Sequence, residues 1–337
     1  MYDTLSTLSG EEKLLLSLCR LDFTEEQKIE IGFLFKEVKD WNHFSQIVNK
    51  HGIIALTAYN IHETGMAYQV PDPVMKNLDN ALMQNIIRNT WLVRRWREVN
   101  IILSEAGVKH VLIKGMALEH TVYRSRGLRQ MTDNDILVKK EDALKTWNLL
   151  QDYGFITDKI KSPLHKKIIT ETGKHLPTLR KEGYAIEIHH QLFQVTEKNK
   201  NLNEVIDNSL EIDVEGSRAY ILDRNVHLDY LKEHLLYHQA TDGSQLRLYL
   251  DMELLQPGSA PSFPDGFLIN PELASNSRHK KHFYKTDFFS LPKGLRFSYL
   301  LGDIFPSLSW MKERHNCGSA KALLFYPQRL GKLIWLI

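Results

Sequence analysis

The sequence is poor in cysteine and has no long apolar run. Cys19 and Cys317 are its only cysteines in 337 residues, and neither stands in a CxxC pair. This excludes a disulfide scaffold and argues against a cysteine metal knuckle, so a reducing compartment is the simplest location. No stretch approaches the roughly 18 apolar residues of a transmembrane helix. The opening MYDTLSTLSGEEK also lacks the basic and apolar regions of a signal peptide. We expect a cytoplasmic protein without a membrane partner.

The chain also lacks an excess of either charge. Its 43 Lys and Arg residues are balanced by 41 Asp and Glu residues, for a formal net charge of +2. Such a balance carries no strong nucleic-acid signature. With 18 glycines and 11 prolines, a collagen-like or wholly disordered chain is excluded. The 43% of hydrophobic residues are enough for a large core, divided among two or three domains or one domain with helical additions.

Residues 1–107 are predicted to form an N-terminal helical region. Ser9 with Glu12, and Thr24 with Gln27, have the spacing of capping boxes. A third helix is expected near 41–50, and a long one from Pro73 to a glycine C-cap at Gly107. The apolar positions of the long helix step mostly by three and four and share one face: Met75, Leu78, Leu82, Ile86, Val93, Trp96, Val99 and Leu103.

The pattern changes over residues 108–198, which we expect to form a small α/β core. Strands are predicted at 108–113 and 135–138, with helices at 115–123 and 141–153. The extended runs 174–179 and 184–189 flank Lys181-Glu182-Gly183, which has the sequence of a hairpin turn. These elements together predict a small mixed sheet.

Residues 199–337 are predicted to return to helix, with the clearest segments at 226–240 and 246–255. Residues 257–294 are rich in Pro, Gly, Ser and Asn and indicate a long loop. The fold class we predict is therefore α+β, with a small mixed sheet between N-terminal and C-terminal helical regions.

Two acids at the start of a predicted strand form the centre of the candidate site. Asp133 and Asp135 are two residues apart in TDNDILV. Side chains alternate across a strand, so both carboxylates are expected on the same side. Two close negative charges are tolerated when they share a cation. Mg²⁺ prefers carboxylate oxygens and commonly binds phosphate oxygens with them. The pair therefore predicts a metal–triphosphate site, although Thr-Asp-Asn-Asp is also good turn chemistry.

The segment before these acids suits phosphate binding. An apolar strand runs into Lys114-Gly115, and a helix is expected to follow. Glycine allows a ligand to approach the backbone closely, and a helix N-terminus offers free N–H groups. Lys114 and Arg129 could add charged hydrogen bonds to a triphosphate. The alternatives are an exposed lysine and an arginine that pairs with a structural acid.

A third acid follows on a later strand. Glu187 stands between Ile186 and Ile188, so it is expected to face away from them and toward the open end of the sheet. There it could bind a metal and accept a proton from an attacking hydroxyl. The alternative is an ordinary solvated strand residue.

In this order, the residues resemble the nucleotidyltransferase superfamily with the polymerase-β-type fold. More closely, they resemble an uncharacterised bacterial nucleotidyltransferase family that is often found beside biosynthetic gene clusters. The similar motifs are LIKGMALEHTVY, LRQMTDNDILV, HLPTL and IEIHHQLF, and they cover residues 110–195. No single motif is specific, but four in the same order are much rarer than one pair of acids.

The resemblance implies a site residue by residue. Three acids match the metal-binding and catalytic carboxylates: Asp133, Asp135 and Glu187. Gly115 matches the glycine of the phosphate loop, and Lys114 and Arg129 match basic positions of the closer family. Together with Met116, which follows the glycine, they are the expected nucleotide-binding residues. The sequence departs from the wider superfamily at Met116, which stands where a serine or glycine is usual, and at Asn134, which stands where an apolar residue is usual.

The histidines leave alternatives open. His175 could approach the site from the hairpin, and His189 or His190 could face it or pack in the core. His234 and His238 are four residues apart on a predicted helix, a spacing that can bind zinc but that also fits a polar network. Arg247 and Asp251 have the same spacing and most simply form a helix pair.

Three functions are compatible with these sequence features. The leading one is Mg²⁺-dependent (or Mn²⁺-dependent) transfer of a nucleotidyl group from an NTP such as ATP to an unidentified acceptor, which could be a small molecule or a macromolecule, with release of pyrophosphate. A second is a non-catalytic nucleotide-binding or scaffold protein of the same fold. A third is a DxD glycosyltransferase, although such enzymes usually carry a larger nucleotide-binding sheet before their acids.

Overall fold

A computed structural model describes most of the chain. The described residues are 8–123, 125–157, 160–193, 196–241, 245–262, 266–269, 284–285, 288–289 and 291–336. The chain divides into two compact units. The first consists of Met1–Arg95, Lys114–Thr132 and Arg224–Asn276, and the second of Trp96–Ile113, Asp133–Asp223 and Ser277–Ile337. Most of the predicted loop at 257–294 lies outside the described residues.

The first unit is helical. Its elements are α1 (Gly10–Leu18), α2 (Glu25–Glu37), α3 (Trp41–Lys50), α4 (Ile54–Glu63), the short 3-10 helix η2 (Ala67–Gln69), the first part of α5 (Asp72–Glu105), α6 (Lys114–Thr121), α10 (Arg224–Thr241) and α11 (Leu246–Leu255). Both predicted capping boxes are present, because Ser9 and Glu12 bond reciprocally and Thr24 and Gln27 do the same. The local sequence thus fixes where α1 and α2 begin.

One apolar cluster holds this unit together. Leu14, Leu15 and Leu18 of α1 are fully buried beside Phe44 of α3 and Ile61 of α4. The same cluster includes residues from α10 and α11, far along the chain: Leu231, Leu235, Tyr249 and Met252. Burial of this apolar surface provides the driving force that packs the N-terminal helices together with α10 and α11.

Helix α5 follows the predicted apolar stripe. Leu78, Val93, Trp96 and Leu103 are fully buried along its length. It ends as predicted: Gly107 has a φ of 69°, and Val108 N–H donates to Leu103 O. This left-handed glycine turns the chain directly into the first strand.

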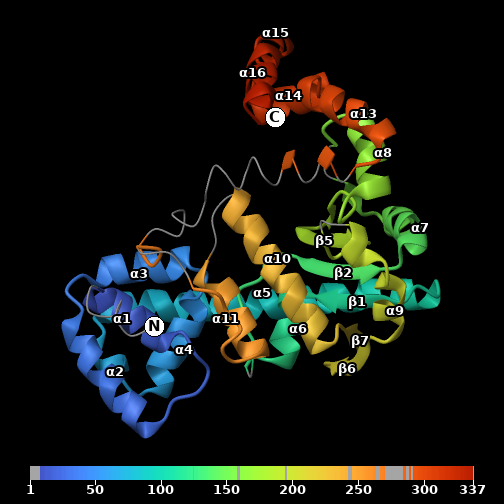
Figure 1. Ribbon diagram of the computed structural model, residues 1–337. Helices are drawn as coiled ribbons and strands as arrows, with labels where there is room; N and C mark the ends of the chain where they lie inside the picture. Colours follow the sequence, from blue (N-terminus) through green and yellow to red (C-terminus); the bar gives the residue numbers. More distant parts are fainter. Residues whose placement is uncertain are drawn as a thin grey trace. The chain divides into compact units, whose positions relative to one another are not determined.

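The second unit contains a seven-stranded mixed sheet, which Figure 1 shows in green and yellow. Its strands are β1 (His110–Ile113), β2 (Asn134–Val138), β3 (Ile156–Thr157), β4 (Leu179–Lys181), β5 (Tyr184–His189), β6 (Leu210–Val214) and β7 (Ser217–Ile221). Their order is β3-β4-β5-β2-β1-β7-β6. β2 pairs antiparallel with β1 and parallel with β5, which places it at the centre. The predicted α+β class is confirmed.

The predicted hairpin is present as β4–β5. Its turn is formed by Glu182 and Gly183, which have φ values of 52° and 83°. β4 starts only at Leu179, later than expected, because Pro177 has no N–H to give to a ladder. Before it, His175 forms an isolated bridge with His189.

One part of the secondary-structure prediction was wrong. After α9 (Leu202–Asp207) the chain does not remain helical but forms the hairpin β6–β7, and β7 pairs parallel with β1. The hairpin turn has Glu215 and Gly216 at positive φ. Most of β6 is exposed, so its polar residues hide the alternation that a buried strand would show. Helix α8 (Pro163–Thr172) also went unpredicted.

The remaining helices of the second unit are α7 (Lys140–Asp152), α13 (Lys293–Ile304), α14 (Leu308–Arg314), α15 (Ser319–Leu323) and α16 (Tyr326–Leu336). α7 packs against β4 and β5, and α13 packs against α8. Cys19 and Cys317 are both free thiols. Within the part of the chain that the structure describes, no helix has the length and apolar character needed to cross a membrane.

Candidate active site

The register between β2 and β5 creates the acidic site. Asp135 lies directly opposite Glu187, and Leu137 lies opposite His189. Residues that are paired on neighbouring strands point to the same face, as do residues two apart on one strand. Asp135, Glu187 and His189 therefore share one face of the sheet.

Their side chains meet closely. His189 Nε2 lies 2.9 Å from Asp135 Oδ1 and 3.5 Å from Glu187 Oε2. One ligand atom from each of the three residues lies within 4.8 Å of the other two. Asp135 is 4% exposed and His189 is 3% exposed, so two of the three groups are held away from bulk water. Carboxylates and imidazole are metal ligands, and this arrangement could hold a divalent cation.

Neighbouring residues orient this cluster. Thr178 Oγ1 donates a hydrogen bond to Glu187 Oε1 over 3.2 Å. The ring of His175 lies beside that of His189, with 5.1 Å between the ring centroids. Thr178 and His175 both come from the segment that leads into β4. The sequence left open whether His175 approaches the site, and the structure places it next to the cluster.

The acid pair predicted from sequence lies only partly in this cluster. Asp133 is half-buried in the bend before β2 and is not one of the three clustered ligands. Asn134, between the two acids, is buried and donates through Nδ2 to Tyr184 Oη over 3.0 Å. The unusual polar residue between the acids thus has a partner on β5.

The predicted phosphate loop has an unusual backbone. Lys114 follows β1 directly, and its φ of 52° places it in the left-handed region. A lysine there is uncommon, and such strain clusters at functional sites. Gly115 comes next, and a Cβ atom on it would lie 2.8 Å from Cγ of Met131. Glycine at this position therefore also makes room for the side chain of Met131. The side chain of the next residue, Met116, is 1% exposed and lies in the core.

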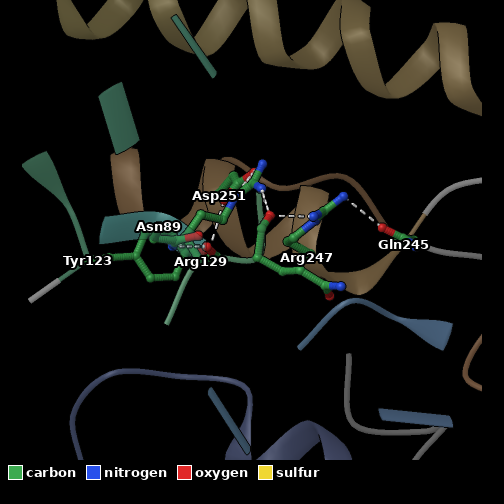
Figure 2. A network of polar contacts seen from close by, with 7 residues as sticks. Asn89, Tyr123, Arg129, Gln245, Arg247 and Asp251 are labelled. Atoms are coloured by element: carbon green, nitrogen blue, oxygen red, sulfur yellow. Dashed lines mark hydrogen bonds and ion pairs between the residues drawn. The ribbon is translucent and has the colours of Figure 1, made fainter. Parts of the chain in front are cut away.

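Arg129 lies in a buried ion pair of the first unit (Figure 2). Its Nε and Nη2 atoms donate to Asp251 over 2.8 Å and 2.7 Å, and the pair is 7% and 0% exposed. Its Nη1 donates to the carbonyl oxygen of Gln130. Asp251 raises the pKa of Arg129 despite its burial. These contacts match the alternative of a structural pair, and the predicted phosphate contact remains a prediction.

The network around Asp251 was not predicted. Tyr123 Oη donates to Asp251 over 2.9 Å, and burial raises the pKa of Tyr123. Arg247, the expected helix partner of Asp251, donates to Gln130 O and Gln245 Oε1 (Figure 2). Sequence spacing missed the Arg129 pair because its members are far apart in the chain. The one signal in the sequence was the position of Asp251 among the apolar residues of LYLDMELL.

A second buried acid completes this network. Glu119 of α6 accepts hydrogen bonds from Asn89 and from the backbone of Gly127. Burial raises the pKa of Glu119 to about 7. Asn89 also donates to Arg129 O over 2.8 Å. Because these bonds hold the segment 127–129 to α5 and α6, we regard Glu119 as a structural acid.

Enzymes commonly bind Mg²⁺ through one or two carboxylates together with the phosphates of a substrate. A comparison with protein families gives the class of the chain. The chain belongs to an uncharacterised nucleotidyltransferase family, whose model matches residues 37–263. The match covers both Asp135 and Glu187. A comparison with curated proteins finds no match.

Proposed function

We propose that this nucleotidyltransferase transfers a nucleotidyl group from an NTP to an acceptor, with release of pyrophosphate. The observation that carries the proposal is the direct pairing of Asp135 with Glu187 on adjacent parallel strands, in a chain of this family. A divalent cation, Mg²⁺ or Mn²⁺, would neutralise charge on the triphosphate. Asp135 and Glu187 would hold it, and Asp133 is proposed as a further carboxylate ligand.

In this reaction an acceptor hydroxyl oxygen forms a bond to the α-phosphorus, and the bond between that phosphorus and the β-phosphate oxygen breaks. Glu187 accepts the hydroxyl proton, and pyrophosphate carries away the electron pair. Lys114 and the backbone N–H groups of Gly115 and Met116 are proposed to bind phosphate oxygens. The positive φ of Lys114 supports a functional role for this turn. We propose the cytoplasm as the location, in keeping with the two free thiols.

A second candidate is a protein that binds nucleotide without turnover. The observation in its favour is that Arg129, which was expected to contact phosphate, donates its hydrogen bonds to Asp251 and Gln130. The absence of a hydroxyl at Met116 points the same way.

Calorimetry with each NTP, with and without Mg²⁺ or Mn²⁺, tests the proposal. We expect metal-dependent binding by the wild type, and loss of that binding in Asp135→Asn and Glu187→Gln. Pyrophosphate release in the presence of an acceptor panel should fall by at least about a hundredfold in both variants. Glu182→Gln, in the exposed turn of the same hairpin, is the matched control and should behave like the wild type.

Unchanged NTP binding in Asp135→Asn would place the nucleotide elsewhere and contradict the proposal. Metal-dependent binding without pyrophosphate release across the panel would favour the non-catalytic candidate.

A further inference from the structure

We propose that His189 is a direct nitrogen ligand of the cation at the Asp135–Glu187 pair, and that this ligand makes the site select Mn²⁺ over Mg²⁺. The inference rests on the proposed function insofar as the cation is bound at this pair. It goes further by assigning the histidine a role and by naming the metal.

The spacing of the ligand atoms fits a single ion. Two ligands at neighbouring positions of an octahedral ion, each about 2.1 Å from the metal, lie about 3 Å apart. His189 Nε2 is 2.9 Å from Asp135 Oδ1 and 3.5 Å from Glu187 Oε2. The same nitrogen thus faces both carboxylates at ligand spacing, and small side-chain adjustments suffice to place a cation among the three.

The polar surroundings of His189 also point to this role. Its Nε2 contacts the two carboxylates, whereas its Nδ1 is buried without a hydrogen-bond partner in the described part of the chain. His51, a buried histidine of the first unit, differs: its Nε2 lies 2.9 Å from Leu268 O, and its Nδ1 accepts from Leu246 N–H. The polar contacts of His189 are therefore made with the acids of the candidate site.

The donor set decides which metal is favoured. Mg²⁺ is a hard ion that takes oxygen ligands almost exclusively and keeps much of its water. Imidazole suits transition ions such as Zn²⁺ and Fe²⁺, and among these ions Mn²⁺ shares the preference of Mg²⁺ for carboxylate oxygens. As a transition ion, Mn²⁺ takes an imidazole nitrogen more readily than Mg²⁺ does. Two carboxylates and one imidazole thus match Mn²⁺ better than Mg²⁺. A dication of either kind would also offset the negative charges of Asp135 and Glu187.

Pulsed electron paramagnetic resonance on the intact protein loaded with MnCl₂ tests the nitrogen ligand directly. We expect electron spin-echo modulation from a directly bound ¹⁴N in the wild type, and its replacement by a ¹⁵N signal after labelling with ¹⁵N-histidine. The modulation should be lost in His189→Gln and kept in His190→Gln, the neighbouring buried histidine. Because the wild-type spectrum needs no variant, the test stands even where a variant folds poorly.

Calorimetry with MnCl₂ and MgCl₂ alone tests the selectivity. We expect the wild type to bind Mn²⁺ at least about tenfold more tightly than Mg²⁺. His189→Gln should lose at least about tenfold in Mn²⁺ affinity and little in Mg²⁺ affinity. Asp135→Asn should weaken the binding of both ions.

The outcomes separate this inference from the proposed function. Cation binding that depends on Asp135 but shows no nitrogen modulation, or equal affinity for the two ions, would overturn the role of His189 and leave the proposed function standing. Failure of both ions to bind, alone or with ATP, would overturn both.

Discussion

At the scale of single residues, the buried ion pair between Arg129 and Asp251 matters most for stability. Desolvation makes such a pair weakly favourable as a whole, but removal of one partner leaves an uncompensated charge inside the protein. Tyr123 and Gln130 add hydrogen bonds to the same two residues. Removal of one partner therefore tests whether Arg129 has a structural role.

We expect Asp251→Asn to lower the free energy of unfolding by about 3–5 kcal/mol, because Arg129 stays charged and buried. Urea titration followed by circular dichroism measures this change. The matched control is Glu211→Gln, which removes the acid of an exposed pair with Arg218 at 3.0 Å. The control should change the free energy by less than about 1 kcal/mol. Equally small effects in both variants would show that the buried pair is not formed.

At the scale of elements, the packing of α13 on α8 depends on one glycine. A Cβ atom on Gly302 would overlap the ring of His165, at its Nδ1 and at 2.6 Å from its Cε1. The ring cannot easily move, because His165 Nδ1 bonds Ser162 Oγ at 2.9 Å and Nε2 lies 3.3 Å from Asp303 Oδ1. Lys161 also pairs with Asp303. These contacts hold the two helices together.

Gly302→Ala should therefore loosen α13 from α8, at a cost of about 1–3 kcal/mol. Limited proteolysis and amide exchange across 293–336 would detect faster cleavage and weaker protection. Gly294→Ala is the control in the same helix, where an added Cβ meets nothing within 4 Å. That control should leave the packing intact and stabilise the helix slightly. Similar protection in the two variants would be evidence against this packing.

At the scale of the whole molecule, buried titratable groups make stability depend on pH. Burial lowers the pKa of His227 to about 4 and that of His165 to about 4. An unfolded histidine binds protons at higher pH, so this contribution is present above pH 6.5 and is lost as the pH falls toward 4. Glu119 acts in the opposite direction, because its pKa is raised by burial to about 7. Its contribution is present below pH 4.5 and is lost as the pH rises through 7.

The variants separate these opposing effects. Between pH 4.5 and 6.5, Glu119→Gln should make the melting temperature rise more steeply with pH, because the histidines then act unopposed. His227→Gln should make the rise shallower over the same range. Melting curves at half-unit pH steps measure both slopes. Slopes that match the wild type in both variants would contradict the assignment of these groups.

The sequence by itself determined those features that depend on neighbours along the chain. Capping boxes, the apolar stripe of α5, the Gly107 stop and the Glu182-Gly183 turn all follow from local backbone and side-chain chemistry. The strands β1, β2 and β5 were also visible, because central strands carry dense apolar residues. The hairpin β6–β7 was not, since an exposed edge strand need not alternate.

Only the tertiary structure decided which distant residues meet. Sequence alternation indicates the side of its own strand on which Glu187 lies, but not which strand is its neighbour. The parallel pairing of β2 with β5 brings Glu187 and His189 to Asp135. Likewise, Asp251 meets Arg129 across 122 positions of sequence. Such pairings are set by how complete elements bury their apolar faces together, and no local pattern in the chain encodes them.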